Sequence, residues 1–155
     1  MQTIEQLLAQ APALAQLSGE HRGVISGCAR NKTFAAEEYL LREGEPADTF
    51  FVIRKGLVAL ETFVPQRGAL AVQTLHDGDL LGWSWLVPPY RVAFDARALA
   101  TTHTLCFDGA CLRGKCEQDT ALGYDLLKLF AAVIVARLQN TRMQLLDVYG
   151  SVASG

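Results

Sequence analysis

The stretch DTFFVIRKGLVALETFV, Asp48 to Val64, decides the fold class of this chain. It consists of two short runs rich in Val, Leu, Phe and Thr, and the pair Lys55-Gly56 separates them. Short runs of β-branched and aromatic residues bounded by turn residues are typical of β-strands. The stretch therefore predicts two consecutive strands joined by a tight turn.

Runs of the same kind flank this stretch, and the turn signals GEPAD, PQRG and HDGD separate several of them. The complete set of runs lies at 32–35, 38–44, 48–56, 57–64, 70–78, 79–83, 91–100 and 103–108. About eight short strands at regular spacing indicate an all-β sandwich or barrel of the jelly-roll type. We expect this β-roll to occupy residues 32–108.

Two helices are predicted before the β-roll. Thr3, with Gln6 three residues later, is a capping pair for a helix that ends near Ala11, just before a proline. Ser18 is the cap of a second helix that continues to about Cys28. We therefore expect residues 1–30 to form N-terminal helices.

After the last predicted strand the pattern becomes helical again, with a short element at 109–119 and a long one at 120–149. Residues 151–155 are expected to form a frayed tail or the start of a linker. The predicted class is mainly β with α: one domain at 1–150 in which an eight-stranded jelly roll lies between N-terminal helices and C-terminal helices at 109–150.

The composition excludes several classes of function. The 155 residues include 14 basic and 16 acidic side chains, for a net charge of −2, whereas a nucleic-acid-binding surface needs clustered basic residues. The first segment, MQTIEQLLAQ, shows no export signal, and the longest uncharged apolar run, Leu129 to Ala136, is too short to span a membrane. We therefore expect a cytoplasmic protein that does not bind membranes.

The chain contains four cysteines: Cys28, Cys106, Cys111 and Cys116. Because no export signal is visible, reduced thiols are the favoured interpretation, rather than the two disulfides of a secreted protein. The cysteine spacing is wrong for zinc and the histidines are scattered, so no metal site is expected. No nucleophile elbow, Ser-His-Asp order or phosphate loop is present, and we expect no enzymatic activity.

The long predicted helix carries two apolar stripes. The first has the spacing of a face packed against the β-roll and consists of Leu122, Leu126, Leu129, Val133 and Ala136. The second, which we call the seam, has a heptad spacing and consists of Tyr124, Leu127, Ala131, Ile134, Leu138, Thr141, Leu145 and Val148. The seam continues after the first stripe has faded near Asn140, so it predicts a homodimer; the alternative is burial of both stripes in one monomer.

Thr141 interrupts the seam with a hydroxyl group. One interpretation is that this hydroxyl bonds to the carbonyl of the preceding helical turn and has no further role. The other is that it offers a polar contact to a molecule lodged between the helices.

Three stretches in this order resemble the cyclic-nucleotide-binding domain superfamily, specifically the sensor half of catabolite-activator-type (Crp/Fnr-like) bacterial regulators. They are REGEPADTFFVIRKGLVAL (42–60), LHDGDLLGW (75–83) and RLQNTRMQLLDVYG (137–150). The first places Gly44 and Gly56 at turns that need a positive φ. Regulators of this type continue into a DNA-binding domain; none follows here, so we expect no nucleic-acid binding by this chain alone.

A ligand site is expected after the HDGD turn. Gly82 can let the chain pass close to a ligand, and Ser84 is a candidate cap for a short helix that stops at Pro88. The unpaired N–H groups at the start of such a helix would face an anion. The resemblance identifies this segment as a phosphate-binding cassette.

The resemblance also implies which side chains contact the ligand. Arg91, followed by Val92 and Ala93, is the candidate for the phosphate contact, and Thr141 matches a threonine that contacts a purine across the dimer. Arg91 lies one position earlier than the resemblance requires, with Val92 in the expected place, and in a strand one residue reverses the side-chain direction.

Two other positions near the cassette differ from the expected pattern. Trp83 stands where the family usually has a Glu that accepts a hydrogen bond from the ribose. The loss of such a charged hydrogen bond costs roughly 1.5–3 kcal/mol of binding. Asp95 lies near the expected phosphate site, but it shares a strand face with Arg97, and a solvent-facing pair is the simplest expectation.

The favoured function is a non-enzymatic, dimeric ligand-sensing module that binds a small anionic ligand in the β-roll, with cyclic AMP or cyclic GMP as candidates, and passes a signal to an unidentified regulatory partner. One alternative is a degenerate, ligand-free dimeric interaction protein whose pocket is filled by Trp83 and Trp85. Another is a sensor of a non-nucleotide small molecule.

Overall fold

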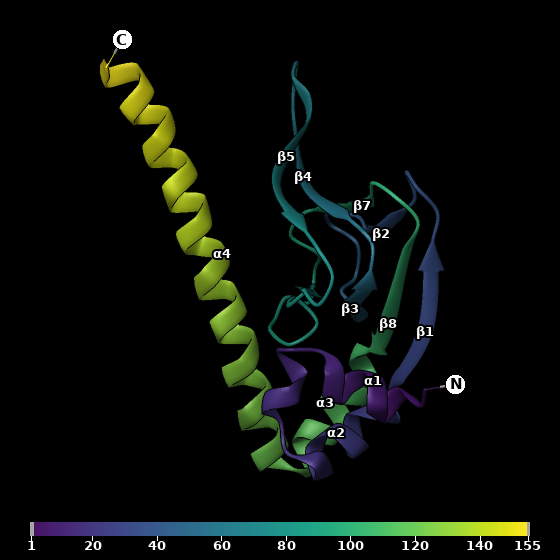
Figure 1. The fold of residues 1–155 in the computed structure, drawn as a ribbon. Helices are drawn as coiled ribbons and strands as arrows, with labels where there is room; N and C mark the ends of the chain where they lie inside the picture. The colour runs from purple at the N-terminus through teal and green to yellow at the C-terminus, as the bar shows by residue number, and fades with distance from the viewer. Residues whose placement is uncertain (1, 155) are drawn as a thin grey trace.

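The computed structural model describes residues 2–154, and its elements follow the predicted order along the chain (Figure 1). The N-terminal helices are α1 (Ile4–Gln10), the 3-10 turn η1 (Leu14–Gln16) and α2 (Gly19–Ser26). The strands are β1 (Ala29–Phe34), β2 (Tyr39–Leu41), β3 (Thr49–Lys55), β4 (Val58–Val64), β5 (Gly68–Leu75), β6 (Leu80–Leu81), β7 (Asp95–Ala98) and β8 (Thr102–Asp108). The C-terminal helices are α3 (Gly109–Gln118) and α4 (Thr120–Ser154).

The first two helices begin at the predicted caps. The Gln6 amide donates to the Thr3 hydroxyl at 3.2 Å, and the Thr3 amide donates to the Gln6 side-chain carbonyl at 2.8 Å, which completes a capping box. The His21 amide donates to the Ser18 hydroxyl at 3.1 Å. Both caps are therefore confirmed, although α2 ends at Ser26 rather than at Cys28.

The strands form two antiparallel sheets of four strands each. The first sheet has the order β1-β8-β3-β6 and the second has the order β2-β7-β4-β5. In the first sheet Phe50 lies opposite Phe107, and Val52 lies opposite Leu105. Because paired residues point to the same face, these four side chains lie on the outer face of that sheet, and the residues between them point into the roll.

The two faces of the first sheet belong to two separate cores. The inner core fills the space between the sheets and includes Phe34, Leu41, Phe51, Ile53, Val58, Leu60, Leu81, Ala96 and Cys106. The outer core packs the helices against the outer face of the first sheet and includes Leu7, Leu14, Ile25, Phe50, Val52, Trp85, Leu105, Phe107, Leu122, Leu126 and Phe130. The roll is thus covered by helices on one side.

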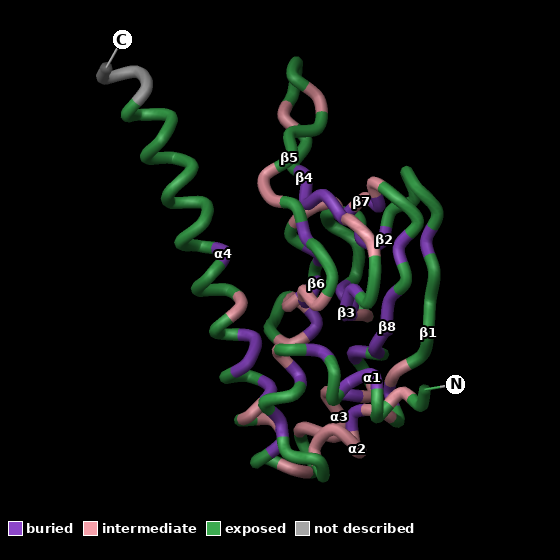
Figure 2. Tube along the Cα trace, viewed as in Figure 1, coloured by how far each residue is buried: buried purple, intermediate pink, exposed green. Residues whose placement is uncertain are grey.

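Helix α4 buries one face in its first half and is exposed over most of its second half (Figure 2). Leu122, Leu126 and Leu129 of the predicted core stripe are buried, Val133 is partly buried, and Ala136 is exposed. Between 131 and 150 the one buried residue is Arg137. The helix also continues through Ser154, so the predicted frayed tail at 151–154 is wrong; Gly155 lies outside the described residues.

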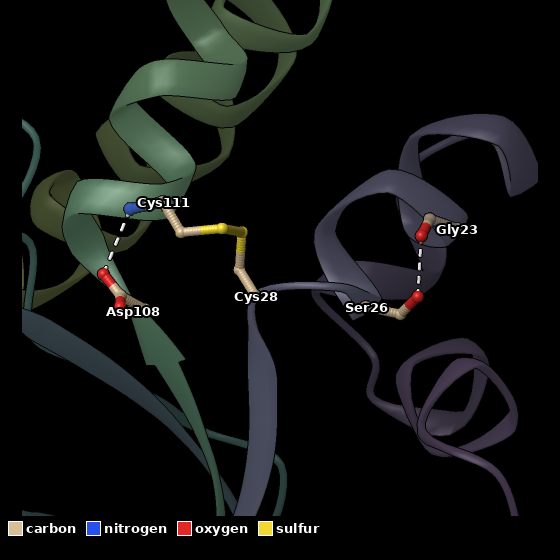
Figure 3. The surroundings of a disulfide bond; sticks show 5 residues. All are labelled: Gly23, Ser26, Cys28, Asp108 and Cys111. Carbon is tan, nitrogen blue, oxygen red and sulfur yellow. Dashed lines mark hydrogen bonds between the residues drawn. A yellow bond between two sulfur atoms is a disulfide. The ribbon is translucent and has the colours of Figure 1, made fainter.

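The prediction of reduced thiols is wrong for two of the cysteines. Cys28 and Cys111 form a disulfide between the start of β1 and the first turn of α3 (Figure 3). The fold brings them together because the Asp108 amide donates to the Cys28 carbonyl at 2.9 Å and the Asp108 carboxylate accepts from the Cys111 amide at 3.0 Å. Cys106 and Cys116 remain free, and burial raises the pKa of the Cys116 thiol.

Because 83 residues separate the two half-cystines, the bond restricts a long loop of the unfolded chain. We expect Cys28→Ser/Cys111→Ser to lower the free energy of unfolding by roughly 2–4 kcal/mol, measured by urea denaturation. Cys116→Ser is the control and should change the free energy of unfolding little. Peptide mapping without reductant should recover a linked Cys28–Cys111 pair, and alkylation of both thiols in the unreduced, unfolded protein would contradict the assignment.

Candidate functional site

The turn before the predicted cassette is fixed to β3 by backbone hydrogen bonds. The Gly78 amide donates to the Ile53 carbonyl at 2.6 Å, and the Ile53 amide donates to the Asp79 carbonyl at 3.0 Å. The Asp79 carboxylate accepts from the His76 amide at 2.8 Å, which closes the turn on itself. The chain therefore enters the cassette in a defined direction.

Gly82 is required where the chain enters the cassette. Its φ is +94°, and a Cβ atom there would lie 3.4 Å from both a methyl group of Leu41 and the carbonyl oxygen of Thr49. The positive φ therefore favours glycine, and an added Cβ would fit closely against these two atoms. The positive φ accounts for the glycine, and the predicted approach of this backbone to a ligand stays a prediction.

The predicted short helix after Gly82 does not form. Residues 84–89 make turns, with the Leu86 amide donating to the Trp83 carbonyl at 3.1 Å and the Tyr90 amide donating to the Val87 carbonyl at 3.1 Å. Pro88 disfavours helical geometry at Val87, and a proline at the next position extends the restriction. No helix N-terminus is therefore available here to bind an anion.

Arg91 and Val92 point in different directions. The backbone of this segment runs beside residues 44–46, with the Val92 amide donating to the Glu45 carbonyl at 2.9 Å and an isolated bridge between Arg91 and Pro46. Val92 is buried in the inner core, whereas the Arg91 side chain is exposed. The one-residue offset predicted from the sequence thus leaves Val92, and not Arg91, facing the interior.

The cavity at the cassette has a volume of about 10 Å³. Its walls are Leu41, Ala47, Thr49, Gly82, Ser84, Val92, Ala93 and Phe94. Four of the predicted ligand residues, Gly82, Ser84, Val92 and Ala93, are brought together there, while Trp83, Arg91 and Thr141 are not part of the wall. Ligand pockets usually measure about 300–1,000 Å³, and about 10–15 Å³ is the minimum for one water molecule. The roll is therefore closed in this conformation.

The two tryptophans have different environments. Trp85 is fully buried in the outer core, where its ring stacks on Phe50 with centroids 5.4 Å apart and meets Phe130 edge-on at 5.5 Å. The hypothesis that Trp85 fills the pocket is therefore wrong. Trp83 is half-buried, and its ring packs edge-on against Phe94 with centroids 5.4 Å apart. Trp83 is not part of the cavity wall, and inner-core aliphatic residues together with Phe94 close the cavity.

Arg137 is a site residue that the sequence interpretation missed. Its side chain is 8% exposed, and its Nη2 donates to the Leu80 carbonyl. The guanidinium also lies 5.2 Å from the centroid of the Trp83 ring, and Nη1 is buried with no hydrogen-bond partner among the described residues. Burial lowers the pKa of Arg137 to about 10, while the nearby Asp79 carboxylate opposes that shift.

The signal for Arg137 was present in the helix pattern. It follows Val133 by four positions and so continues the stripe that packs against the roll, at the point where that stripe loses its apolar residues. A cation in that position must either bend away or find partners in the roll. It finds them on either side of Gly82, at Leu80 and Trp83.

Within one chain, the Thr141 hydroxyl bonds to the preceding helical turn, which is the first of its two interpretations. Its hydroxyl donates to the Arg137 carbonyl at 3.0 Å, four residues earlier in the helix. It makes no contact with the cassette cavity.

The predicted Asp95–Arg97 pair is wrong. Arg97 binds Glu61 through two hydrogen bonds of 2.9 Å, and these bonds hold the pKa of the Glu61 carboxyl below its usual value. Asp95 accepts from the Glu43 amide at 2.8 Å and lies 3.5 Å from Arg42 Nε. Each charge thus has a partner on a neighbouring strand or loop: Glu61 lies opposite Asp95 in the register of β4 and β7, and Arg97 reaches it diagonally.

Among residues 2–154 no group of three or more His, Cys, Asp or Glu side chains is placed to hold a metal ion. Within the same range, no helix combines the length and the apolar character needed to cross a membrane.

Comparison with known proteins identifies the fold. The family model of the cyclic nucleotide-binding domain matches residues 31–119, while no curated protein matches the chain. A candidate cyclic nucleotide-binding protein from Geobacter metallireducens is 29% identical, with a TM-score of 0.78 over 89% of this chain and 99% of that one.

Two more distant structures share the fold. The sensor domain of the transcriptional regulator DNR from Pseudomonas aeruginosa is 17% identical, with a TM-score of 0.69 over 87% of this chain and 91% of that one. The regulatory subunit of a cAMP-independent protein kinase A from Trypanosoma brucei is 19% identical, with a TM-score of 0.69 over 84% of this chain and 46% of that one.

Proposed function

The chain belongs to the family of cyclic nucleotide-binding domains, and from that premise we propose that it is a non-enzymatic regulatory module that works as a homodimer through α4. The observation that carries this proposal is the exposed seam on α4. Its apolar members Tyr124, Leu127, Leu138, Leu145 and Val148 are each more than half exposed, and Leu138 reaches 66%.

A second copy of the chain is the occupant that fits the seam best. A strip of large apolar side chains that extends over nearly four heptads is costly in water and complementary to itself. Its heptad spacing is the one at which two helices interlock side chains along their whole length. The C-terminal end of α4 stands away from the roll (Figure 1), so a partner helix has access to it.

Signalling in this proposal uses the contact between α4 and the cassette. Arg137 joins α4 to Leu80 and Trp83, which flank Gly82. Farther along, the Gln144 side chain donates to the Val72 carbonyl of β5 at 3.0 Å. A change in the cassette would therefore shift α4, and in a dimer it would change the angle between two helices.

Cyclic nucleotide sensing is the second candidate function. The family, the positive φ of Gly82 at the entry to the cassette and the position of Thr141 on the seam favour it. Against it stand the closed cavity, the exposed Arg91 and the missing ribose acceptor at Trp83. The fold does not itself require cyclic AMP, since the kinase subunit from Trypanosoma brucei is described as cAMP-independent. The geometry therefore favours a module whose roll is closed to cyclic nucleotides in this conformation.

The dimer is tested by placing a charge in the seam. We expect Ile134→Glu to convert the protein to a monomer in sedimentation equilibrium, because two carboxylates would face each other across an apolar contact. Ala132→Glu carries the same charge on the opposite, exposed face of α4 and should remain a dimer. A monomeric wild-type protein, or a dimer that persists in Ile134→Glu, would refute the proposal.

The closed roll is tested by calorimetric titration. We expect neither cyclic AMP nor cyclic GMP to give a saturable heat, or to raise the melting temperature, at concentrations up to about 1 mM. Saturable binding would establish the second candidate function instead. If binding occurs, the affinity of Arg91→Ala shows whether Arg91 contacts the ligand. A weakened affinity means that the side chain turns into the roll when the ligand binds.

A further inference from the structure

Three residues of α4, spaced seven apart, hold the helix against its own roll. Phe130 packs in the outer core. Arg137 donates to the Leu80 carbonyl, and Gln144 donates to the Val72 carbonyl at 3.0 Å. With the seam at positions a and d of the heptad, these three residues occupy position g. The g side of α4 is therefore the side that contacts its own roll.

The other side of the seam carries exposed apolar residues that do not belong to the seam itself. Val135 and Tyr149 occupy e positions and are 53% and 64% exposed, and Leu146, three residues before Tyr149, is 52% exposed. We call these three residues the outer flank. In a simple pair of helices the e positions are often charged. Large exposed apolar side chains on this side therefore indicate a contact beyond the seam.

Pairing along the seam determines what the outer flank faces. In a parallel pair of helices, each g residue of one helix lies beside the e residue that follows it on the partner. The partner's Tyr149 thus comes beside Gln144, the residue that binds β5. The places beside Phe130 and Arg137 offer no open surface, because both side chains are already buried. The pair at Gln144 is therefore the one that is free to make a new contact.

Strand β5 presents an exposed leucine at the height of Tyr149. The end of β5 shares a cleft wall with residues 133–140 of α4, and Val72 is bonded to Gln144, so the strand toward its hairpin runs in the direction of the helix (Figure 1). Leu70 lies two residues beyond Val72, about 7 Å along the strand. Tyr149 lies five residues beyond Gln144, about 7.5 Å along the helix. Leu70 is 42% exposed and is therefore open to a contact.

We propose that, in the dimer, the outer flank of one α4 docks on strand β5 of the other chain, with Tyr149 packed against the partner's Leu70. This inference rests on the proposed dimer and adds a second contact to it. β5 is the end strand of its sheet, and proteins commonly cover such an edge with another element. The contact joins the roll of each chain to the helix of the other, so a movement of one helix reaches both rolls.

Leu70→Ser tests this contact separately from the seam, because Leu70 lies on the roll and not on α4. We expect Leu70→Ser and Tyr149→Ser each to raise the dissociation constant of the dimer about tenfold in sedimentation equilibrium, because the burial of a large apolar side chain is lost. The double variant should show less than the product of the two effects, since both remove one contact. Tyr39→Ser is the control: Tyr39 is 39% exposed on β2, the opposite edge of the same sheet, and should leave the constant unchanged. A thermal melt by circular dichroism checks that each variant is folded.

A cross-link between chains tests the position directly. Leu70→Cys and Tyr149→Cys proteins, each also carrying Cys116→Ser, are mixed, allowed to exchange subunits and treated with a short thiol-to-thiol cross-linker. We expect a linked heterodimer, and less of it when Met143→Cys, 58% exposed on α4 outside the seam and the outer flank, replaces Tyr149→Cys.

The outcomes separate this contact from the dimer itself. A monomeric wild-type protein would overturn the proposed dimer and this contact together. A dimer that is as tight with Leu70→Ser as with Tyr39→Ser, or that links through Met143→Cys as readily as through Tyr149→Cys, would overturn this contact and leave the dimer standing.

Discussion

The ring of Phe50 is the contact on which the rest of the structure depends. It stacks on Phe107 of β8 with centroids 4.3 Å apart, meets Phe130 of α4 at 5.0 Å and stacks on Trp85 of the cassette at 5.4 Å. One fully buried side chain thus joins the first sheet, the cassette and the root of the long helix. Because Trp85 must reach this cluster, its segment turns toward the helices, and the roll closes over aliphatic residues and Phe94 instead.

The same cluster divides α4 into two parts with different roles. Up to Phe130 the helix belongs to the outer core, and beyond it Arg137 is the one buried residue through Gly150. A buried guanidinium with one unpaired nitrogen is a costly way to hold a helix, which explains the lowered pKa of that group. Arg137 thereby ties α4 to Leu80 and Trp83, while large apolar members of the seam stay exposed.

Local patterns predicted the caps at Thr3 and Ser18, the strand order, the turn glycine at Gly82 and the two stripes of α4, because each depends on neighbours within a few residues. The missing helix after Gly82 is a local error caused by Pro88, whereas the larger errors involve partners far apart in the chain. Cys28 and Cys111 meet only through the pairing of β1 with β8, Arg97 finds Glu61 on another strand, and Trp85 turns to a cluster drawn from three elements. The offset of Arg91 was visible in the sequence. That Leu41 and Phe94 close the cavity could not be predicted, because it depends on how the two sheets pack.

The central claim is that two copies of this chain pair along the seam, each residue near the axis meeting its own counterpart. Leu138 is the most exposed apolar member of the seam, so Leu138→Cys provides the most direct measurement. Mild oxidation should yield a covalent dimer on a non-reducing gel, whereas Ala132→Cys on the opposite face should stay monomeric on the same gel. A Leu138→Cys protein that forms no more covalent dimer than Ala132→Cys would contradict the account.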